Sequence, residues 1–278
     1  MRALVFTDLD GCLLDHDSYS FDAALPALDR LDELQIPVVF NSSKTKAEML
    51  SLRRTLRNQH PFISENGAGV FMPLHYFEQQ PAGTKSLDDF WVREFGVRRS
   101  DCRQVLDRLR VPFQGQFTAF SDLDTQGIAQ LTGLDAAAAQ RSAQRDFSEP
   151  VHWLGDEAGR QKFVDAVRAN GLQTLQGGRF LTLGGAANKG AAMTWLRAQY
   201  ARAWRDQDIE VLAIGDSGND VDMLEAASHA LLVRSPAHAL PALRRDPDTI
   251  TVSDQTGPAG WAEGVVHWLD NVNSEQSI

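Results

Sequence analysis

The chain has 278 residues, of which 43% are hydrophobic and 23% charged, and this composition excludes collagen, coiled-coil and disordered classes. It carries 27 Lys and Arg against 37 Asp and Glu, so its formal net charge of −10 repels nucleic acid and anionic lipid. No apolar run approaches the roughly 18 residues of a membrane span, and we expect no signal peptide. Its two cysteines, Cys12 and Cys102, cannot build a disulfide framework, although one bond between them stays open. We therefore expect a cytoplasmic protein without a nucleic-acid or membrane partner.

The start of the chain alternates short apolar runs with helix-like segments. The first run is typical of a buried parallel strand and stops at Asp8-Leu9-Asp10-Gly11, and the second ends at a polar segment that includes Ser42. The predicted strands cover residues 2–7, 36–40 and 61–64, and the predicted helices cover 25–34 and 46–56. This order is that of βαβ units and predicts an open, largely parallel sheet.

The same pattern returns near the other end of the chain. An apolar strand over residues 210–214 stops at Gly215-Asp216-Ser217-Gly218-Asn219-Asp220, and a helix over 221–227 and a strand over 230–233 follow. Ligands of open parallel sheets bind outside the carboxyl ends of the strands, so we expect these polar clusters to meet in one crevice. The sheet is therefore predicted to be assembled from both ends of the chain.

The middle of the chain lacks this pattern of an apolar strand followed by acids. Its predicted helices cover residues 86–95 and 157–169, and its predicted strands cover 147–153 and 180–183. We interpret it as an inserted α+β domain. The predicted fold class is α/β, a Rossmann-like parallel-sheet core (1–82 and 186–278) with an inserted α+β cap domain (83–185).

Acidic residues at the strand ends carry the first chemical signal. Asp8 and Asp10 lie two apart, so a strand would point both side chains to one face. Two carboxylates that close raise each other's pKa unless a cation joins them, and oxygen ligands favour Mg²⁺. On its own, however, an Asp-x-Asp-Gly segment is better explained by a simple turn. The remaining strand-end and helix-start residues, Asp216, Asp220, Ser42 and Lys189, complete a set suited to phosphoryl transfer.

These motifs resemble, in order and spacing, the four motifs of the haloacid dehalogenase-like phosphatases. The insertion is similar to the cap of the Cof-type subgroup, which tends to carry a turn like Glu65-Asn66-Gly67-Ala68. Segments 41–45, 147–150, 178–180 and 257–261 resemble the mannosyl-3-phosphoglycerate phosphatase group. One departure is Cys12, which stands where many members have Thr and is a weaker hydrogen-bonder.

The resemblance implies a role for each motif residue. Asp8 would be the nucleophile that forms an aspartyl-phosphate, and Asp10 would protonate the leaving oxygen and then deprotonate water. The other implied roles are phosphate binding by Ser42 and Lys189, Mg²⁺ binding by Asp8, Asp216 and the main-chain carbonyl of Asp10, and orientation of Lys189 or metal-bound water by Asn219 and Asp220. The implied partner is a small phosphorylated sugar or glycerate.

Candidate substrate ligands also have plainer explanations. Arg179 is the cap candidate for bidentate binding of a glycerate carboxylate, or else a surface ion-pair partner. Lys44 could contact the same anion or simply face solvent at a helix start. Ser148 and Glu149 could bind sugar hydroxyls or merely cap a strand. Trp261 could close over the sugar, although packing is the commoner role of such an aromatic residue.

Several functions stay open on these residues. The leading hypothesis is Mg²⁺-dependent hydrolysis of a phosphate monoester of a glycosyl-glycerate, with mannosyl-3-phosphoglycerate as the specific prediction. The alternatives are glucosyl-3-phosphoglycerate, other sugar phosphates, a phosphosugar mutase and a non-catalytic sensor. We expect a monomer or a weak homodimer. The histidines have no ligand spacing, so we expect no catalytic or zinc role for His16, His60, His75, His152, His229, His238 and His267.

Overall fold

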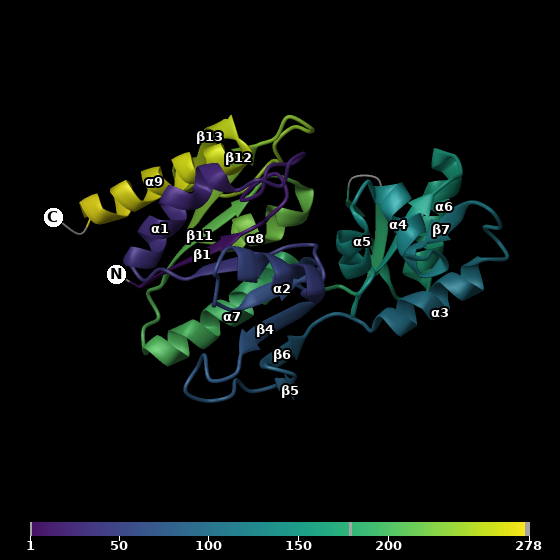
Figure 1. Ribbon diagram of the computed structural model, residues 1–278, viewed down its shortest axis with the longest axis horizontal. Helices are drawn as coiled ribbons and strands as arrows, with labels where there is room; N and C mark the ends of the chain where they lie inside the picture. The colour runs from purple at the N-terminus through teal and green to yellow at the C-terminus, as the bar shows by residue number, and fades with distance from the viewer. Residues whose placement is uncertain (1, 178–179, 276–278) are drawn as a thin grey trace.

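The computed structural model describes residues 2–177 and 180–275, which form two lobes (Figure 1). Both ends of the chain build the larger lobe, a nine-stranded sheet in the order β13-β12-β11-β1-β2-β3-β4-β6-β5. The middle of the chain builds the smaller lobe on a four-stranded antiparallel sheet in the order β7-β8-β10-β9. The predicted α/β class, with a parallel-sheet core and an inserted α+β cap, is confirmed.

The elements have the following bounds. The strands of the large sheet are β1 (Ala3–Thr7), β2 (Val38–Asn41), β3 (Phe62–Ser64), β4 (Gly69–Pro73), β5 (Lys85–Leu87), β6 (Phe90–Glu94), β11 (Glu210–Gly215), β12 (His229–Arg234) and β13 (Ile250–Thr256). Those of the small sheet are β7 (Phe117–Ala119), β8 (Glu149–Trp153), β9 (Gln173–Gly177) and β10 (Phe180–Gly184). The α-helices are α1 (Leu25–Glu33), α2 (Lys46–Thr55), α3 (Arg99–Leu109), α4 (Thr125–Thr132), α5 (Ala136–Ser142), α6 (Glu157–Ala169), α7 (Lys189–Trp204), α8 (Val221–Ala226) and α9 (Gly257–Glu275). Within the described part of the chain, none of these helices combines the length and apolar character of a membrane span.

Burial on both faces of the large sheet explains its apolar strands. In β1, Ala3 and Val5 belong to the core cluster that α1 and α9 cover, whereas Leu4 and Phe6 belong to the cluster that α7 and α8 cover. Because side chains alternate along a strand, a strand buried on both faces must be apolar at every position. Each fully buried Leu or Phe contributes about 1.5–3 kcal/mol of transfer free energy. This packing holds the carboxyl ends of β11, β1 and β2 side by side.

The start of the cap is where the sequence-based prediction fails. Residues 86–95 were expected to be helical, but they contribute to the hairpin of β5 and β6, which pairs with β4. Asp88 has a φ of 51°, which suits the two-residue turn of a tight hairpin, and Phe90, Trp91 and Val92 bury their side chains. The predicted boundary at residue 83 therefore falls before strands that extend the large sheet. The other predicted strands and the helix over 157–169, which is α6, are confirmed.

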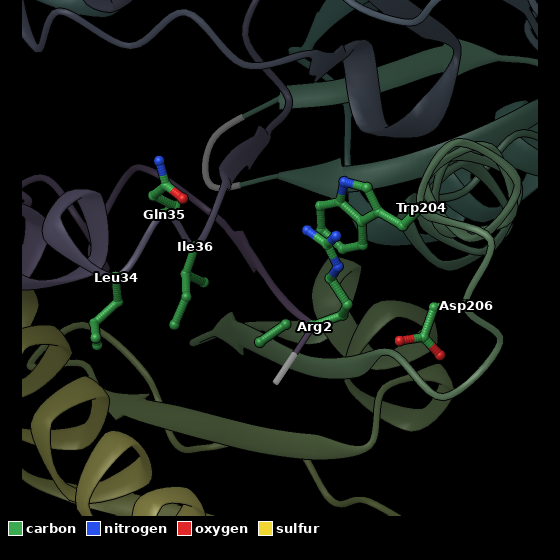
Figure 2. Close-up of a pocket in the computed structure, with 7 residues that line it drawn as sticks. Arg2, Leu34, Gln35, Ile36, Trp204 and Asp206 are labelled. Atoms are coloured by element: carbon green, nitrogen blue, oxygen red, sulfur yellow. The ribbon is translucent and has the colours of Figure 1, made fainter.

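A cavity of about 380 Å³ lies at the amino ends of the parallel strands (Figure 2). Its walls come from the start of β1, the turn before β2 and the end of α7, and the guanidinium of Arg2 lies 5.1 Å from the ring centre of Trp204. This edge of the sheet is opposite to the carboxyl ends, where the predicted site residues lie.

Candidate functional site

The carboxyl ends of neighbouring strands bring the predicted residues together. Asp8 follows β1 and Asp216 follows β11, and these two strands pair in parallel. Carboxylate oxygens of Asp8, Asp216 and Asp220 all lie within 4.8 Å of one another, and all three residues are buried. The expected meeting of acidic side chains at the strand ends is therefore confirmed, and its members come from opposite ends of the chain.

Lys189 is the cation at the centre of this cluster. Asn188 caps α7, its side chain accepting a hydrogen bond of 2.7 Å from the backbone N–H of Ala191, so Lys189 begins the helix at a defined place. The Lys189 side chain is fully buried, and its Nζ lies 2.8 Å from Asp8 Oδ1 and 2.7 Å from Asp220 Oδ1. Burial lowers the pKa of this ammonium, but the two carboxylates outweigh burial and raise it. Lys189 therefore stays charged beside Asp8.

Asp220 positions its neighbours with both of its oxygens. Oδ1 contacts Lys189, and Oδ2 accepts hydrogen bonds from the backbone N–H groups of Asp216 at 3.2 Å and Ser217 at 3.1 Å. A side chain at Gly215 would meet Asp220, because a Cβ there would lie 2.5 Å from the Asp220 Cβ. Both carboxylate oxygens of Asp220 therefore have partners within the protein.

The donor set of this acidic cluster fits Mg²⁺. Gly11, with a φ of 77°, lets the backbone pass so close to Asp216 that a Cβ at position 11 would lie 2.6 Å from Asp216 Oδ2. Burial, followed by the charges of Asp8 and Asp220, raises the pKa of Asp216 from 3.8 to about 7. A hard divalent cation with oxygen preference relieves this repulsion. The resemblance assigned Asp8, Asp216 and the main-chain carbonyl of Asp10 to the metal, and the side-chain cluster contains Asp8 and Asp216 together with Asp220.

The raised pKa of Asp216 predicts pH-dependent Mg²⁺ binding. The metal-free native state holds this proton up to about pH 7, whereas the unfolded chain loses it near the usual pKa of 3.8. As the pH rises from about 4 to about 7, Asp216 therefore makes the metal-free protein progressively less stable. Mg²⁺ needs the ionised carboxylate. We expect Mg²⁺ to raise the melting temperature more at about pH 8 than at about pH 6, measured by scanning calorimetry. An equal rise at both pH values would contradict this assignment.

Asp10 and Lys44 form a second charged pair beside the cluster. Lys44 Nζ lies 2.7 Å from Asp10 Oδ1 and 5.2 Å from the ring centre of Tyr19. Burial lowers the pKa of Lys44, but Asp10 and Glu48 more than offset burial, so the pKa rises. The side chain of Asp10 therefore points to Lys44 rather than to Lys189.

The segment after β2 brings Ser42 and Lys44 to the same edge. Ser42 is fully buried, and its Oγ accepts a hydrogen bond of 3.3 Å from the backbone N–H of Lys44. Helix α2 begins directly afterwards because Thr45 and Glu48 form a capping box, with Thr45 Oγ1 accepting from the Glu48 N–H at 3.2 Å. This local Thr-x-x-Glu pattern fixes where the strand-end loop stops.

The cap candidates from the sequence have structural partners. The Ser148 hydroxyl donates to Glu65 and accepts a hydrogen bond of 2.9 Å from Arg145. Glu149 is fully buried, and its carboxylate accepts from Arg99 and from the backbone N–H of Ser121 at 2.7 Å. Arg179 lies outside the described residues.

Trp261 does not close over a sugar. Its ring is fully buried in the core between the large sheet and α9, and its Nε1 donates a hydrogen bond of 2.9 Å to Thr7 Oγ1. The packing alternative is therefore the correct one for Trp261. Both cysteines are free and buried, so the bond left open between Cys12 and Cys102 does not form.

Glu149 is expected to stabilise the cap rather than to bind sugar. Glu149→Gln removes one charge of a buried ion pair and should lower the free energy of unfolding by about 2–3 kcal/mol, measured by urea denaturation. Glu157→Gln, which alters an exposed pair with Arg160 on α6, is the matched control and should leave stability unchanged. A Glu149 variant of normal stability with a raised KM for substrate would instead favour sugar binding.

Sequence reasoning missed one residue beside the acidic cluster. His238, in the loop between β12 and β13, places Nε2 3.2 Å from Asp216 Oδ2. The histidines had been set aside because none shows ligand spacing along the chain. No local signal marks His238, since the loop that carries it is placed by the packing of β12 and β13.

Comparisons with known proteins agree with this geometry. The haloacid dehalogenase-like hydrolase family matches residues 5–90, and the sucrose-6F-phosphate phosphohydrolase family matches residues 175–269. A glucosyl-3-phosphoglycerate/mannosyl-3-phosphoglycerate phosphatase from Methanococcoides burtonii is 35% identical over 278 residues, which is 99% of this chain and 100% of the relative.

Solved structures share the fold at lower identity. A haloalkanoate-superfamily phosphatase from Bacteroides thetaiotaomicron is 16% identical with a TM-score of 0.65, covering 96% of this chain and 95% of its own. The sucrose-phosphatase from Synechocystis, solved with sucrose and phosphate, is 14% identical with a TM-score of 0.62, covering 96% and 98%. Since the likeness to the Methanococcoides relative runs through core and cap alike, the chain belongs to the haloacid dehalogenase-like hydrolases and is a phosphatase that acts on phosphate monoesters.

Proposed function

We propose that the protein hydrolyses the phosphate monoester of a glycosyl-3-phosphoglycerate in the presence of Mg²⁺, with mannosyl-3-phosphoglycerate as the first substrate and glucosyl-3-phosphoglycerate as the second. The observation that carries the substrate class is the 35% identity, across core and cap, to a relative named for both compounds. The buried contact between Lys189 and Asp8 supports phosphoryl transfer at this site.

In the proposed mechanism Asp8 is the nucleophile. Its carboxylate attacks phosphorus, and the bond between phosphorus and the sugar-side oxygen breaks as the aspartyl-phosphate forms. Asp10 gives its proton to the leaving oxygen. A water then attacks phosphorus, its proton passes to Asp10, and the bond to Asp8 breaks to release inorganic phosphate.

The surrounding residues balance charge in this scheme. In this scheme Ser42 and Lys189 hold the phosphoryl oxygens, and Lys44, which pairs with Asp10, binds the glycerate carboxylate. Asp8, Asp216 and the main-chain carbonyl of Asp10 would hold Mg²⁺, which supplies positive charge against the developing negative charge. Asp220 keeps Lys189 and the Asp216 loop in place.

The test is phosphate release in the presence of Mg²⁺ from mannosyl- and glucosyl-3-phosphoglycerate beside simple sugar phosphates, with Asp8→Asn as the blank. A strong preference for a glycosyl-3-phosphoglycerate is expected. Broad, weak hydrolysis of every ester would contradict the substrate assignment and would indicate a general sugar-phosphate phosphatase. Isomerisation of a sugar 1-phosphate primed by a bisphosphate would identify a mutase, and substrate binding without phosphate release would identify a sensor.

A cytoplasmic location and a monomeric or weakly dimeric state stay predictions. Sedimentation velocity over a range of protein concentrations measures the second of these. A tight dimer would contradict it.

A further inference from the structure

Three consecutive residues after β3, Glu65, Asn66 and Gly67, form a turn that we call the bridging turn. Their φ angles are 49°, 58° and 92°, all in the left-handed region, which is uncommon for a residue such as Glu. The N–H of Glu65 donates to the Lys44 carbonyl and that of Asn66 to the Ser42 carbonyl, each at 3.0 Å. The surroundings therefore hold an unfavourable backbone conformation directly behind the strand-end loop of β2.

The bridging turn also packs against the start of α7. A Cβ at Gly67 would lie 2.1 Å from the carbonyl oxygen of Asn188 and 2.9 Å from the backbone N of Lys189. Only glycine fits at this distance. The turn therefore contacts two of the loops that carry the proposed phosphate ligands.

Asn66 reaches a third loop, the one that carries Asp216. Its Oδ1 accepts a hydrogen bond of 3.1 Å from Asn219 Nδ2, and Asn219 Oδ1 accepts one of 2.5 Å from Ser217 Oγ. The Ser217 N–H is in turn held by Asp220 at 3.1 Å. A displacement of Asn66 would therefore loosen the loop that positions Asp216.

Glu65 reaches the cap. Its buried carboxylate accepts hydrogen bonds from the backbone N–H groups of Asp146 at 2.8 Å and Phe147 at 3.2 Å, and from the Ser148 hydroxyl. Arg145 adds a cation at 3.9 Å. All these partners belong to the cap segment before β8, 80 or more residues away along the chain. Buried carboxylates need such partners, and here the partners come from the other lobe.

The cap segment at residues 145–148 is where the cap rests on the core. Phe147 is buried in the core cluster of the large sheet, and the carbonyl of Asp146 accepts a hydrogen bond of 2.8 Å from the backbone N–H of Arg99 at the start of α3. Nearby, Thr45 Oγ1 donates 2.9 Å to the carbonyl of Arg141 in α5, the cap helix that faces α2 (Figure 1). Glu65 therefore holds the cap against the core next to the loop that carries Ser42 and Lys44.

We propose that the bridging turn is a positioning unit with two arms, in which Glu65 seats the cap over the substrate and Asn66 holds the Asp216 loop for Mg²⁺. Neither residue reacts with the substrate. The inference deepens the proposed function and rests on it for the identity of the cap-dependent substrate. Changes at Glu65 should therefore alter kcat/KM for the large substrate, and changes at Asn66 should alter the affinity for Mg²⁺.

The Glu65 arm is tested with a large and a small substrate. Glu65→Gln replaces one acceptor oxygen with an NH₂ group that faces the N–H donors of the cap segment, so it should loosen the contact between cap and core. The kcat/KM for the glycosyl-3-phosphoglycerate should therefore fall about tenfold or more. Hydrolysis of p-nitrophenyl phosphate, which is too small to need the cap, should change by less than about twofold. Glu33→Gln, on an exposed carboxylate of α1, is the matched control. An equal fall for both substrates, at temperatures where the variant is folded, would overturn this arm.

The Asn66 arm is tested by Mg²⁺ binding rather than by activity. Asn66→Gly keeps the left-handed backbone but removes the amide, and it should weaken Mg²⁺ binding about tenfold in titration calorimetry. Asn66→Asp keeps the acceptor oxygen for Asn219 and should restore binding. Wild-type Mg²⁺ affinity in Asn66→Gly would overturn this arm. If the wild-type protein shows no preference for glycosyl-3-phosphoglycerates, the proposed substrate fails, while the calorimetric result still decides the role of Asn66.

Discussion

Asp8→Asn is expected to reduce phosphate release at least about 10³-fold while the protein stays folded. Asn has nearly the same shape as Asp but offers no carboxylate oxygen to attack phosphorus. Asp8 is buried beside Asp216 and Asp220, so its removal also relieves like-charge repulsion, which offsets the lost contact with Lys189. The melting temperature should therefore stay within about 5 °C of the wild type.

The matched control for this variant is Asp17→Asn, which changes an exposed carboxylate in the loop after β1. Its activity and melting temperature should equal those of the wild type. Both variants are measured with the same Mg²⁺ and substrate concentrations, by phosphate release and by scanning calorimetry. Full activity of Asp8→Asn would exclude Asp8 as the nucleophile and with it the proposed mechanism.

Lys189→Met is expected to cost about 3–5 kcal/mol of the free energy of unfolding and to abolish activity, because it leaves buried carboxylates without their cation. Lys189 Nζ contacts Asp8 and Asp220, and the side chain is fully buried. Burial raises the pKa of Asp220, and the charge of Lys189 offsets this rise only in part. The loss of stability should therefore be larger at about pH 8, where the carboxylates are ionised, than at about pH 5, where protonation neutralises part of the cluster.

Urea denaturation at the two pH values measures this effect. Lys162→Met, at an exposed position of α6, is the control and should change stability little. The double variant Lys189→Met with Asp220→Asn should regain part of the lost stability, because one uncompensated charge is removed as well. Equal destabilisation by Lys189→Met at both pH values, without recovery in the double variant, would argue for lost packing instead of lost charge.

The parallel core and the acidic residues at its edge could be predicted from the order of apolar strands and polar strand ends. Strands buried on both faces must be apolar throughout, and parallel strands present their carboxyl ends along one edge, so the residues after β1 and β11 had to meet. Asp8, Asp216 and Asp220 could be placed together for this reason, whereas Lys189, at the start of a helix, was grouped with them by the resemblance of the motifs. The turn of residues 65–68 was visible as a motif, but its partners were not.

The partner of each polar side chain, in contrast, depends on how the elements pack. The Asp88 turn and the pairing of β6 with β4 turned a predicted helix into a hairpin, because packing on a sheet edge overrides a weak local propensity. The contacts of Glu65 with the cap and of His238 with Asp216 join residues far apart along the chain. The periodicity of apolar residues shows which face of a helix or strand is buried. The contacts of Glu65 and His238 depend instead on how elements distant in sequence pack together, and no local sequence pattern encodes that packing.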